Sequence, residues 1–484
     1  MAELYDKTSP KSIEEYARQL LGTTLREYTH GEIAQRFHGK GNLGQLLEED
    51  FFHYKVNSRS EPDFAEAGVE LKSTPMKTLK SGELVAKERL VLNIINYMEE
   101  CKQTFRTSSF WHKNRHLLLM FYLWEKGQLG IDCVFKIIRL WQYPATDLKI
   151  IKDDWNVIHK KIMQGKADEI SEGDTFYLAA CPNVSSSQSL REQPFSDRKA
   201  MQRAYSLKPK YMNSIIRISE SGVEPKIDME EIDWVLDEWE DGVAREPFAE
   251  YKRKKAASFE PIVKSVGQYE TKSETFSEYV ESQFAPYFGM TEEQIACHFG
   301  LQPLGQRVKS RYWLLTKAIL GIHKDKVEEF EKAGITVKTI RLNKKGRLKE
   351  SMSFPTIQYG QIVEEQWEDS PFYETLSNKF FFVVYQEQAD GQYSLLDAFF
   401  WNMPLKDMES VRLVWEDTKR KIQDGDFTHF TKITENPISH VRPHARDSHD
   451  LMLAPNHTWQ KKCCFWLNRS YVSDIVSSRI AARG

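Results

Sequence analysis

Residues 63–74 read DFAEAGVELKST, and residues 329–340 read EFEKAGITVKTI. Both stretches place a glycine before alternating apolar and polar residues, a pattern typical of a strand with one buried face. The first copy carries Glu70 where the second carries Thr336. A strand sequence that occurs twice, with the acid missing from one copy, indicates two related domains that differ in their chemistry.

Two more pairs of segments support a duplication. WNVIHKKIMQG (155–165) matches WEDTKRKIQDG (415–425), and YSLKPKYMNSII (205–216) matches FWLNRSYVSDIV (465–476). The three pairs keep the same order and nearly the same spacing, which one chance match between amphipathic segments would not produce.

The repeat predicts the domain plan of the 484-residue chain. We expect one domain over residues 1–220, an acidic helix with a linker over 221–284, and a second domain over 285–484. In each half, segments with helical spacing precede alternating or continuously apolar segments, and a helix around the Trp-x5-Lys-Ile-x2-Gly signature follows. The predicted fold class is therefore mixed α/β (α+β) in two tandem domains.

Composition excludes several classes of protein. The longest apolar run, Leu117 to Trp124, is too short to span a bilayer and reads as a buried strand. The N-terminal segment has charges throughout and no apolar signal core, so we expect a cytoplasmic protein without membrane contact. The six cysteines show no CxxC spacing, which argues against a zinc site or a disulfide framework. A net charge of −3 hides a basic run over residues 198–217.

The strand 68–75 places Glu70 and Lys72 on one face, because successive side chains of a strand point to opposite sides. Asp63 lies where the chain turns into this strand, so its carboxylate can approach that of Glu70. Two close carboxylates repel each other unless a cation lies between them, and hard oxygen ligands suit Mg²⁺. We expect Asp63 and Glu70 to be metal ligands, with Lys72 orienting water or stabilising charge.

This acidic pair fits metal-assisted hydrolysis of a nucleic-acid backbone. A third acid on the preceding helix could ligate a second metal ion or orient water, and by spacing alone Glu48 and Glu49 serve almost equally well. The D-x6-E-x-K pattern also occurs by chance on the exposed faces of strands.

The run GNLGQLLEEDFFHY, with EPDFAEAGVELKSTP and KERLVLNIINY after it, resembles the MutH family of endonucleases. It is most similar to the type II restriction endonucleases that cut at GATC and carry two MutH-like domains. The family motif K-G-x-x-G-x-x-L-E matches Lys40 through Glu48, which implies Glu48 as the third acid. The resemblance also implies a second active-site lysine, and Lys113 in TSSFWHK is the nearest match.

The resemblance places DNA recognition in the C-terminal part of each domain. In the first domain, arginine suits a guanine edge and lysine suits phosphates. The residues expected to bind DNA are Lys40, Arg203, Ser206, Lys208 and Lys210.

In the second domain Glu329 corresponds to Asp63, Thr336 to Glu70, and Lys338 to Lys72, while Lys317 lies opposite Glu48. Threonine supplies no anionic ligand, so we expect this copy to be catalytically silent. The resemblance implies that such a domain binds a second GATC and acts as an effector.

One active centre per chain implies a monomer that pairs on DNA, and a restriction enzyme implies a partner methyltransferase. Two alternatives stay open, a mismatch-repair nickase of the MutH type and a non-catalytic DNA-binding regulator.

Overall fold

The computed structural model describes residues 4–33, 36–37, 42–54, 61–183, 189–237, 259–301, 311–444, 447 and 449–483. The chain forms two compact units. The first comprises Met1–Ala256, Val263–Thr275 and Glu331–Ala333, and the second comprises Ala257–Ile262, Phe276–Phe330 and Gly334–Gly484. The domain boundaries expected at residues 220 and 285 stay a prediction.

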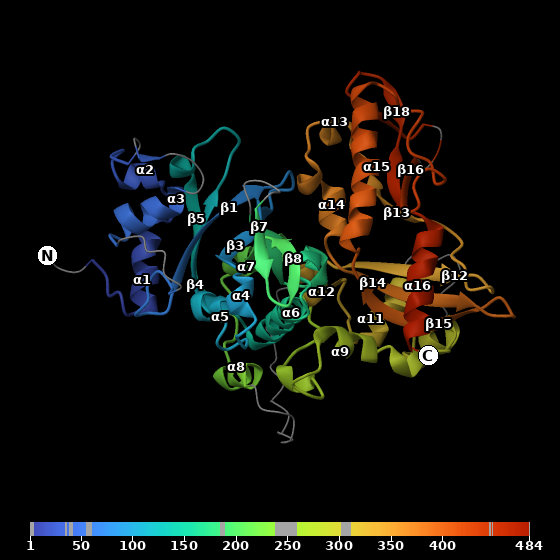
Figure 1. The fold of residues 1–484 in the computed structure, drawn as a ribbon, viewed down its shortest axis with the longest axis horizontal. Helices are drawn as coiled ribbons and strands as arrows, with labels where there is room; N and C mark the ends of the chain where they lie inside the picture. Colours follow the sequence, from blue (N-terminus) through green and yellow to red (C-terminus); the bar gives the residue numbers. More distant parts are fainter. Residues whose placement is uncertain are drawn as a thin grey trace. The chain divides into compact units, whose positions relative to one another are not determined.

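The main sheet of the first unit has the strand order β2-β1-β4-β5 among the described residues (Figure 1). β1 (Glu70–Thr78) runs parallel to β4 (His116–Leu123), whereas β2 (Leu84–Ala86) pairs antiparallel with β1, and β5 (Val134–Gln142) pairs antiparallel with β4. β4 is an inner strand with both faces covered, which explains its continuous apolar sequence. The predicted buried strand is confirmed.

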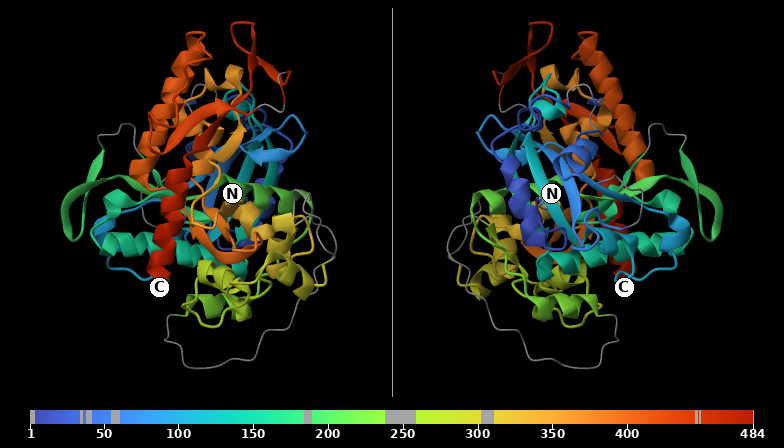
Figure 2. Two further views of the ribbon diagram at one scale, coloured as in Figure 1. Left: turned by 90° about the vertical axis from the view of Figure 1, so that its right-hand side faces the viewer. Right: turned by 90° about the vertical axis from the view of Figure 1, so that its left-hand side faces the viewer.

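A second sheet of the first unit has the order β3-β9-β6. Its strands are β3 (Leu90–Ile94), β9 (Arg203–Leu207) and β6 (Leu178–Pro182). The hairpin of β7 (Leu190–Gln193) and β8 (Ser196–Met201) stands out from its unit in both views of Figure 2. The described helices of this unit are α1 (Pro10–Ala17), α2 (Leu25–Tyr28), α3 (Asn42–Leu46), α4 (Tyr97–Glu100), α5 (Ser109–Asn114), α6 (Ala145–Met163), α7 (Pro209–Glu220) and α8 (Met229–Leu236).

The second unit repeats this plan. β12 (Thr336–Leu342) runs parallel to β14 (Phe380–Glu387), β15 (Tyr393–Trp401) pairs antiparallel with β14, and a second sheet has the order β13-β19-β16. α15 (Leu405–Gln423) and α6 have the same length of 19 residues, and each follows a proline N-cap. The orders β1-β4-β5 and β3-β9-β6 of the first unit recur as β12-β14-β15 and β13-β19-β16 in the second, which confirms the predicted duplication and the mixed α/β class.

The remaining elements of the second unit are short strands and flanking helices. They are β10 (Phe259–Glu260), β11 (Lys326–Val327), β13 (Met352–Thr356), β16 (Ser439–Pro443), β17 (Leu451–Leu453), β18 (Trp459–Lys461), β19 (Cys463–Leu467), α9 (Phe276–Ser282), α10 (Glu292–His298), α11 (Arg311–Ile319), α13 (Tyr359–Ile362), α14 (Pro371–Leu376) and α16 (Arg469–Arg483). α12 (Glu328–Ala333) precedes β12.

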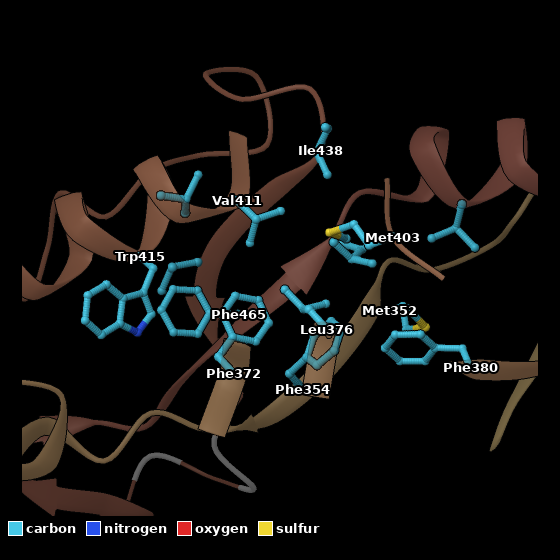
Figure 3. Packing of buried hydrophobic residues seen from close by; sticks show 14 of the residues in the cluster. Met352, Phe354, Phe372, Leu376, Phe380, Met403, Val411, Trp415, Ile438 and Phe465 are labelled. Carbon is cyan, nitrogen blue, oxygen red and sulfur yellow. The ribbon is translucent and has the colours of Figure 1, made fainter. Parts of the chain in front are cut away.

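Each unit has its own hydrophobic core. In the second unit, Phe372 of α14 stacks on Phe465 of β19 with ring centroids 4.3 Å apart, and Trp415 and Val411 of α15 pack beside them (Figure 3). The core of the first unit joins α1, α3 and the face of β4 that carries Leu118 and Met120. These cores hold the strands that carry the candidate site residues.

The acidic helix predicted between the domains is present as α8. Asp228 caps its N-terminus, and Ile232 and Val235 are buried. Residues 238–258 of the predicted helix and linker lie outside the described residues. Among the described residues, none of the helices is both long and apolar enough to cross a membrane.

Candidate active site

A tight loop brings Asp63 back to the start of β1. The backbone N–H of Phe64 donates to the carbonyl of Val69 at 2.9 Å, and Val69 returns a bond to Phe64 at 3.2 Å. Gly68 closes the loop with φ +64°, and a Cβ there would lie 3.2 Å from the Arg115 guanidinium. Both the backbone angle and the space therefore favour glycine at this position.

This loop links the two predicted metal ligands. The Asp63 N–H donates to Glu70 Oε2 at 3.2 Å, and Asp63 Oδ2 accepts from the N–H of Leu71 at 2.9 Å. The sequence-based expectation that the two acids approach each other at the strand entrance agrees with this geometry.

Two lysines converge on the Glu70 carboxylate, which is 2% exposed. Lys72 Nζ lies 2.7 Å from Glu70 Oε1, and Lys113 Nζ lies 3.5 Å from the same oxygen. Lys113 comes from the last turn of α5. A buried anion is stabilised only when opposite charge or donors reach it, and these two cations supply that charge.

Glu48 lies in a π-helical turn over Leu47–Phe51. The Phe52 N–H bonds to the carbonyl of Leu47 at 2.9 Å, which is the i to i+5 pattern of such a turn. Single π-helical turns are frequent at functional sites because they redirect one side chain of a helix. Apolar periodicity does not reveal this turn, so the sequence predicted an ordinary helix here.

The carboxylates form one electrostatic group. Burial, followed by the negative charges of Asp63 and Glu70, raises the pKa of Glu48 to about 7 against the opposing effect of Lys72 and Lys113. Burial and the charge of Glu70 likewise raise the pKa of Asp63 to about 6. Three carboxylates therefore share this site with two ammonium groups, which is a potential excess of one negative charge.

This excess of negative charge fits a divalent cation. Carboxylate oxygens are the hard ligands that Mg²⁺ prefers, and Mg²⁺ commonly uses one or two of them together with water and substrate phosphate. Across the described ranges, there is no group of three or more Asp, Glu, His or Cys side chains placed to hold a metal ion alone. The donor set thus fits a cation that completes its coordination with water and DNA.

The predicted DNA-binding residues lie in a different environment. Arg203 and Lys208 are buried and donate to the carbonyls of Ala180 and Thr175, both at 2.7 Å. Ser206 is fully buried and donates to the carbonyl of Ala179 at 3.5 Å.

Only Lys210, in the first turn of α7, is partly exposed among the predicted DNA-binding residues that the structure describes, and Lys40 lies outside the described residues. Direct DNA contact by these residues stays a prediction, and three of the donors are already bonded within the fold.

The second unit lacks the acid at the corresponding strand. Thr336 begins β12, and the neighbouring Lys338 Nζ donates to the carbonyl of Ser353 at 3.0 Å. Glu329 is buried and accepts from the N–H of Ile262 at 2.9 Å, while Lys317 donates to the carbonyl of Lys324. The side chains that correspond to a nuclease centre here serve internal contacts.

Comparisons with known proteins agree with this geometry. The model of the family described as DNA mismatch repair enzyme MutH matches residues 52–154 and 321–413, one region in each unit. The chain is 33% identical to the type II restriction enzyme Sau3AI of Staphylococcus aureus, over 96% of this chain and 98% of that enzyme. It is 28% identical to the DNA mismatch repair protein MutH of Shewanella woodyi, over 38% of this chain and 80% of that protein.

The first matched region contains Asp63, Glu70, Lys72 and Lys113, and the second contains Thr336. The match to the restriction enzyme runs through both units, whereas the match to the repair protein covers the length of about one. Restriction enzymes with such a nuclease domain bind double-stranded DNA and generally use a divalent metal ion. The chain therefore belongs to the MutH-like type II restriction endonucleases, with two MutH-like domains, and is a site-specific deoxyribonuclease.

Proposed function

We propose that this endonuclease cuts double-stranded DNA at 5′-GATC-3′ in a Mg²⁺-dependent reaction and leaves four-base 5′ overhangs. The second domain would be inactive and would bind a second GATC as an effector. One observation carries the proposal: Glu70 is buried between two lysines in the first unit, and Thr336 stands at the matching strand position of the second.

Each residue of the first unit has a role that follows from its position. Asp63 and Glu70 would hold the Mg²⁺ ion, and Glu48 would either bind a second ion or orient the attacking water. The bound ion would lower the pKa of a water molecule and would stabilise the negative charge that develops on the phosphate during hydrolysis.

Lys72 and Lys113 would change partners during the reaction. Without metal, both ammonium groups neutralise Glu70. With a cation bound at that carboxylate, the two lysines would be available to the scissile phosphate and would stabilise the negative charge of its transition state.

The single complete centre also predicts how two strands are cut. A palindromic site presents the same scissile bond on each strand, so one centre per chain needs a second chain or a second cleavage event. We propose a monomer in solution that pairs on DNA carrying two sites. A cognate DNA methyltransferase would protect the host's own sites.

Digestion of an unmodified plasmid with Mg²⁺, followed by sequencing of the ends, tests this function. Four-base GATC 5′ overhangs are expected. Persistent nicks would instead favour the repair-type nickase, and intact DNA would favour a binding protein.

Glu70→Ala should abolish cleavage while DNA binding persists, because the variant loses a metal ligand and keeps the basic side chains. Thr336→Ala is the matched control at the same strand position of the second unit, and its cleavage of one-site DNA should equal that of the wild type. An active Glu70→Ala variant would contradict the assignment of Glu70.

A further inference from the structure

Tyr54 contacts the elements that carry the acidic group, and its hydroxyl is one of several buried polar atoms without a partner in the described part of the chain. The oxygen is buried, and among the described residues no donor or acceptor hydrogen-bonds it. Buried polar groups are nearly always satisfied, since water is lost on burial and must be replaced by a partner. An exception in a nuclease site therefore needs a physical reason.

The position of Tyr54 is fixed at both ends by elements that carry acids. Its backbone N–H donates to the carbonyl of Glu48 at 3.0 Å. Its ring makes an edge contact with the ring of Phe64, with centroids 5.2 Å apart, and Phe64 directly follows Asp63. The phenol is thus held between the π-helical turn of Glu48 and the loop of Asp63.

The charges of the site reach this phenol. After burial itself, the negative charges of Asp63, Glu48 and Glu70 raise the pKa of Tyr54 well above its usual range. The hydroxyl therefore keeps its proton at any working pH, and its neutral O–H is a hydrogen-bond donor beside carboxylates.

The Glu48 carboxylate is the acceptor best suited to this donor. Among the described residues none of the side-chain or backbone donors bonds to it, whereas Asp63 accepts from Leu71 and Glu70 is contacted by Lys72. Both carboxylate oxygens of Glu48 are hydrogen-bond acceptors, and hydrogen bonds to a carboxylate are stronger than those to a neutral acceptor.

We propose that Tyr54 is a positioning residue whose hydroxyl donates a hydrogen bond to the Glu48 carboxylate when the enzyme holds its metal ion and DNA. The inference rests on the proposed role of Glu48. Partners that orient a metal-binding carboxylate change affinity or activity by about 10- to 100-fold when they are removed.

Tyr54→Phe tests the inference because it removes only the hydroxyl and keeps the ring between its neighbours. We expect cleavage to slow by about 10- to 100-fold. The acidic limb of the pH–rate profile should move to higher pH, since a donated hydrogen bond favours the ionised carboxylate and its loss raises the pKa of Glu48. The midpoint of a Ca²⁺ titration followed by thermal shift, without catalysis, should rise.

Stability of the metal-free protein separates this role from a structural one. Removal of a buried hydroxyl without a partner should leave the melting temperature in EDTA unchanged or raise it. Tyr143→Phe is the matched control, because its hydroxyl is also buried without a described partner and burial alone raises the pKa of Tyr143. This control should cleave and bind Ca²⁺ like the wild type.

Several results would overturn the inference. A Tyr54→Phe enzyme with wild-type rate, pH profile and Ca²⁺ midpoint would end it, and so would a melting temperature that falls in proportion to activity. Glu48→Gln separates the two claims. If Glu48→Gln cleaves like the wild type, the role of Glu48 fails and Tyr54 loses its acceptor; if it is inactive while Tyr54→Phe is normal, only the Tyr54 inference fails.

Discussion

Replacement of Asp63 by asparagine should stabilise the metal-free enzyme, and the gain should depend on pH. Asparagine is nearly isosteric and its side-chain oxygen can still accept the 2.9 Å hydrogen bond from Leu71. What it removes is a carboxylate whose pKa is raised from 3.8 to about 6 by burial and by Glu70. The folded chain therefore holds this proton more tightly than the unfolded chain does.

The sign of the pH dependence follows from proton binding. Stability from Asp63 is fully present below the unfolded pKa and is lost as pH rises through the folded pKa, because only the folded state resists ionisation. A shift of about 2 units corresponds to about 3 kcal/mol. The part that develops between pH 4.5 and pH 7.5 is about 2 kcal/mol. Glu48 acts in the same direction, but it is more exposed and solvent screening reduces its share.

Urea unfolding in EDTA at several pH values measures this effect as a difference between two proteins. The free energy of unfolding of Asp63→Asn minus that of the wild type should grow by about 2 kcal/mol from pH 4.5 to pH 7.5. Asp197→Asn, at an exposed position of β8, is the control and should show a flat difference. Ca²⁺ should stabilise the wild type far more at pH 7.5 than at pH 4.5.

A flat or falling difference for Asp63→Asn would refute the reasoning. It would mean that the negative charge of Asp63 is already neutralised in the folded state. The site would then lack the excess negative charge on which metal binding depends. Equal stabilisation of both proteins by Ca²⁺ at pH 7.5 would place the cation elsewhere.

Two further substitutions test the second unit and the buried cations. Arg203→Met removes the bond to Ala180 and should cost about 1–3 kcal/mol of stability by urea unfolding. If Arg203 contacts DNA as expected, the DNA affinity of the folded variant in gel shifts should also fall, and an unchanged affinity would contradict that contact. Thr336→Glu in the Glu70→Ala background should leave plasmid uncut, because Lys338 is bonded to Ser353 and Lys317 replaces the third acid. Any cleavage would contradict the assignment of catalysis to the first unit alone.

The sequence predicted the elements that depend on local pattern. Alternation over residues 68–75 defines β1, and the strand period places Glu70 and Lys72 on one face, as their 2.7 Å contact shows. The continuous apolar run from Leu117 predicts an inner strand, since a strand covered on both faces has no polar side. The repeat predicts the second unit because the same pattern recurs there.

The basic run over residues 198–217 shows where such reasoning stops. Arg203 and Ser206, which we expected to contact DNA, lie on β9, the middle strand between β3 and β6, and their contact with DNA stays a prediction. A middle strand has neighbours on both edges and cover on its faces, so cations on it must find partners within the protein. A linear charge pattern contains no information about strand order. The π-helical turn of Glu48 likewise cannot be recognised from the pattern of charged or apolar residues.

The two copies differ in electrostatics more than in fold. In the first unit, burial and mutual repulsion raise the pKa of Glu48 and Asp63, so the metal-free site is less stable than its packing alone allows. In the second, Thr336 removes one negative charge, and Lys338 is bonded to a backbone carbonyl instead of to an acid. Burial lowers the pKa of Lys338, which is the shift expected of a cation without an anionic partner. Loss of one carboxylate therefore changes the role of the neighbouring side chains. Lys338 no longer balances a carboxylate, and β12 keeps its place in the sheet without a buried negative charge that a metal ion would have to neutralise.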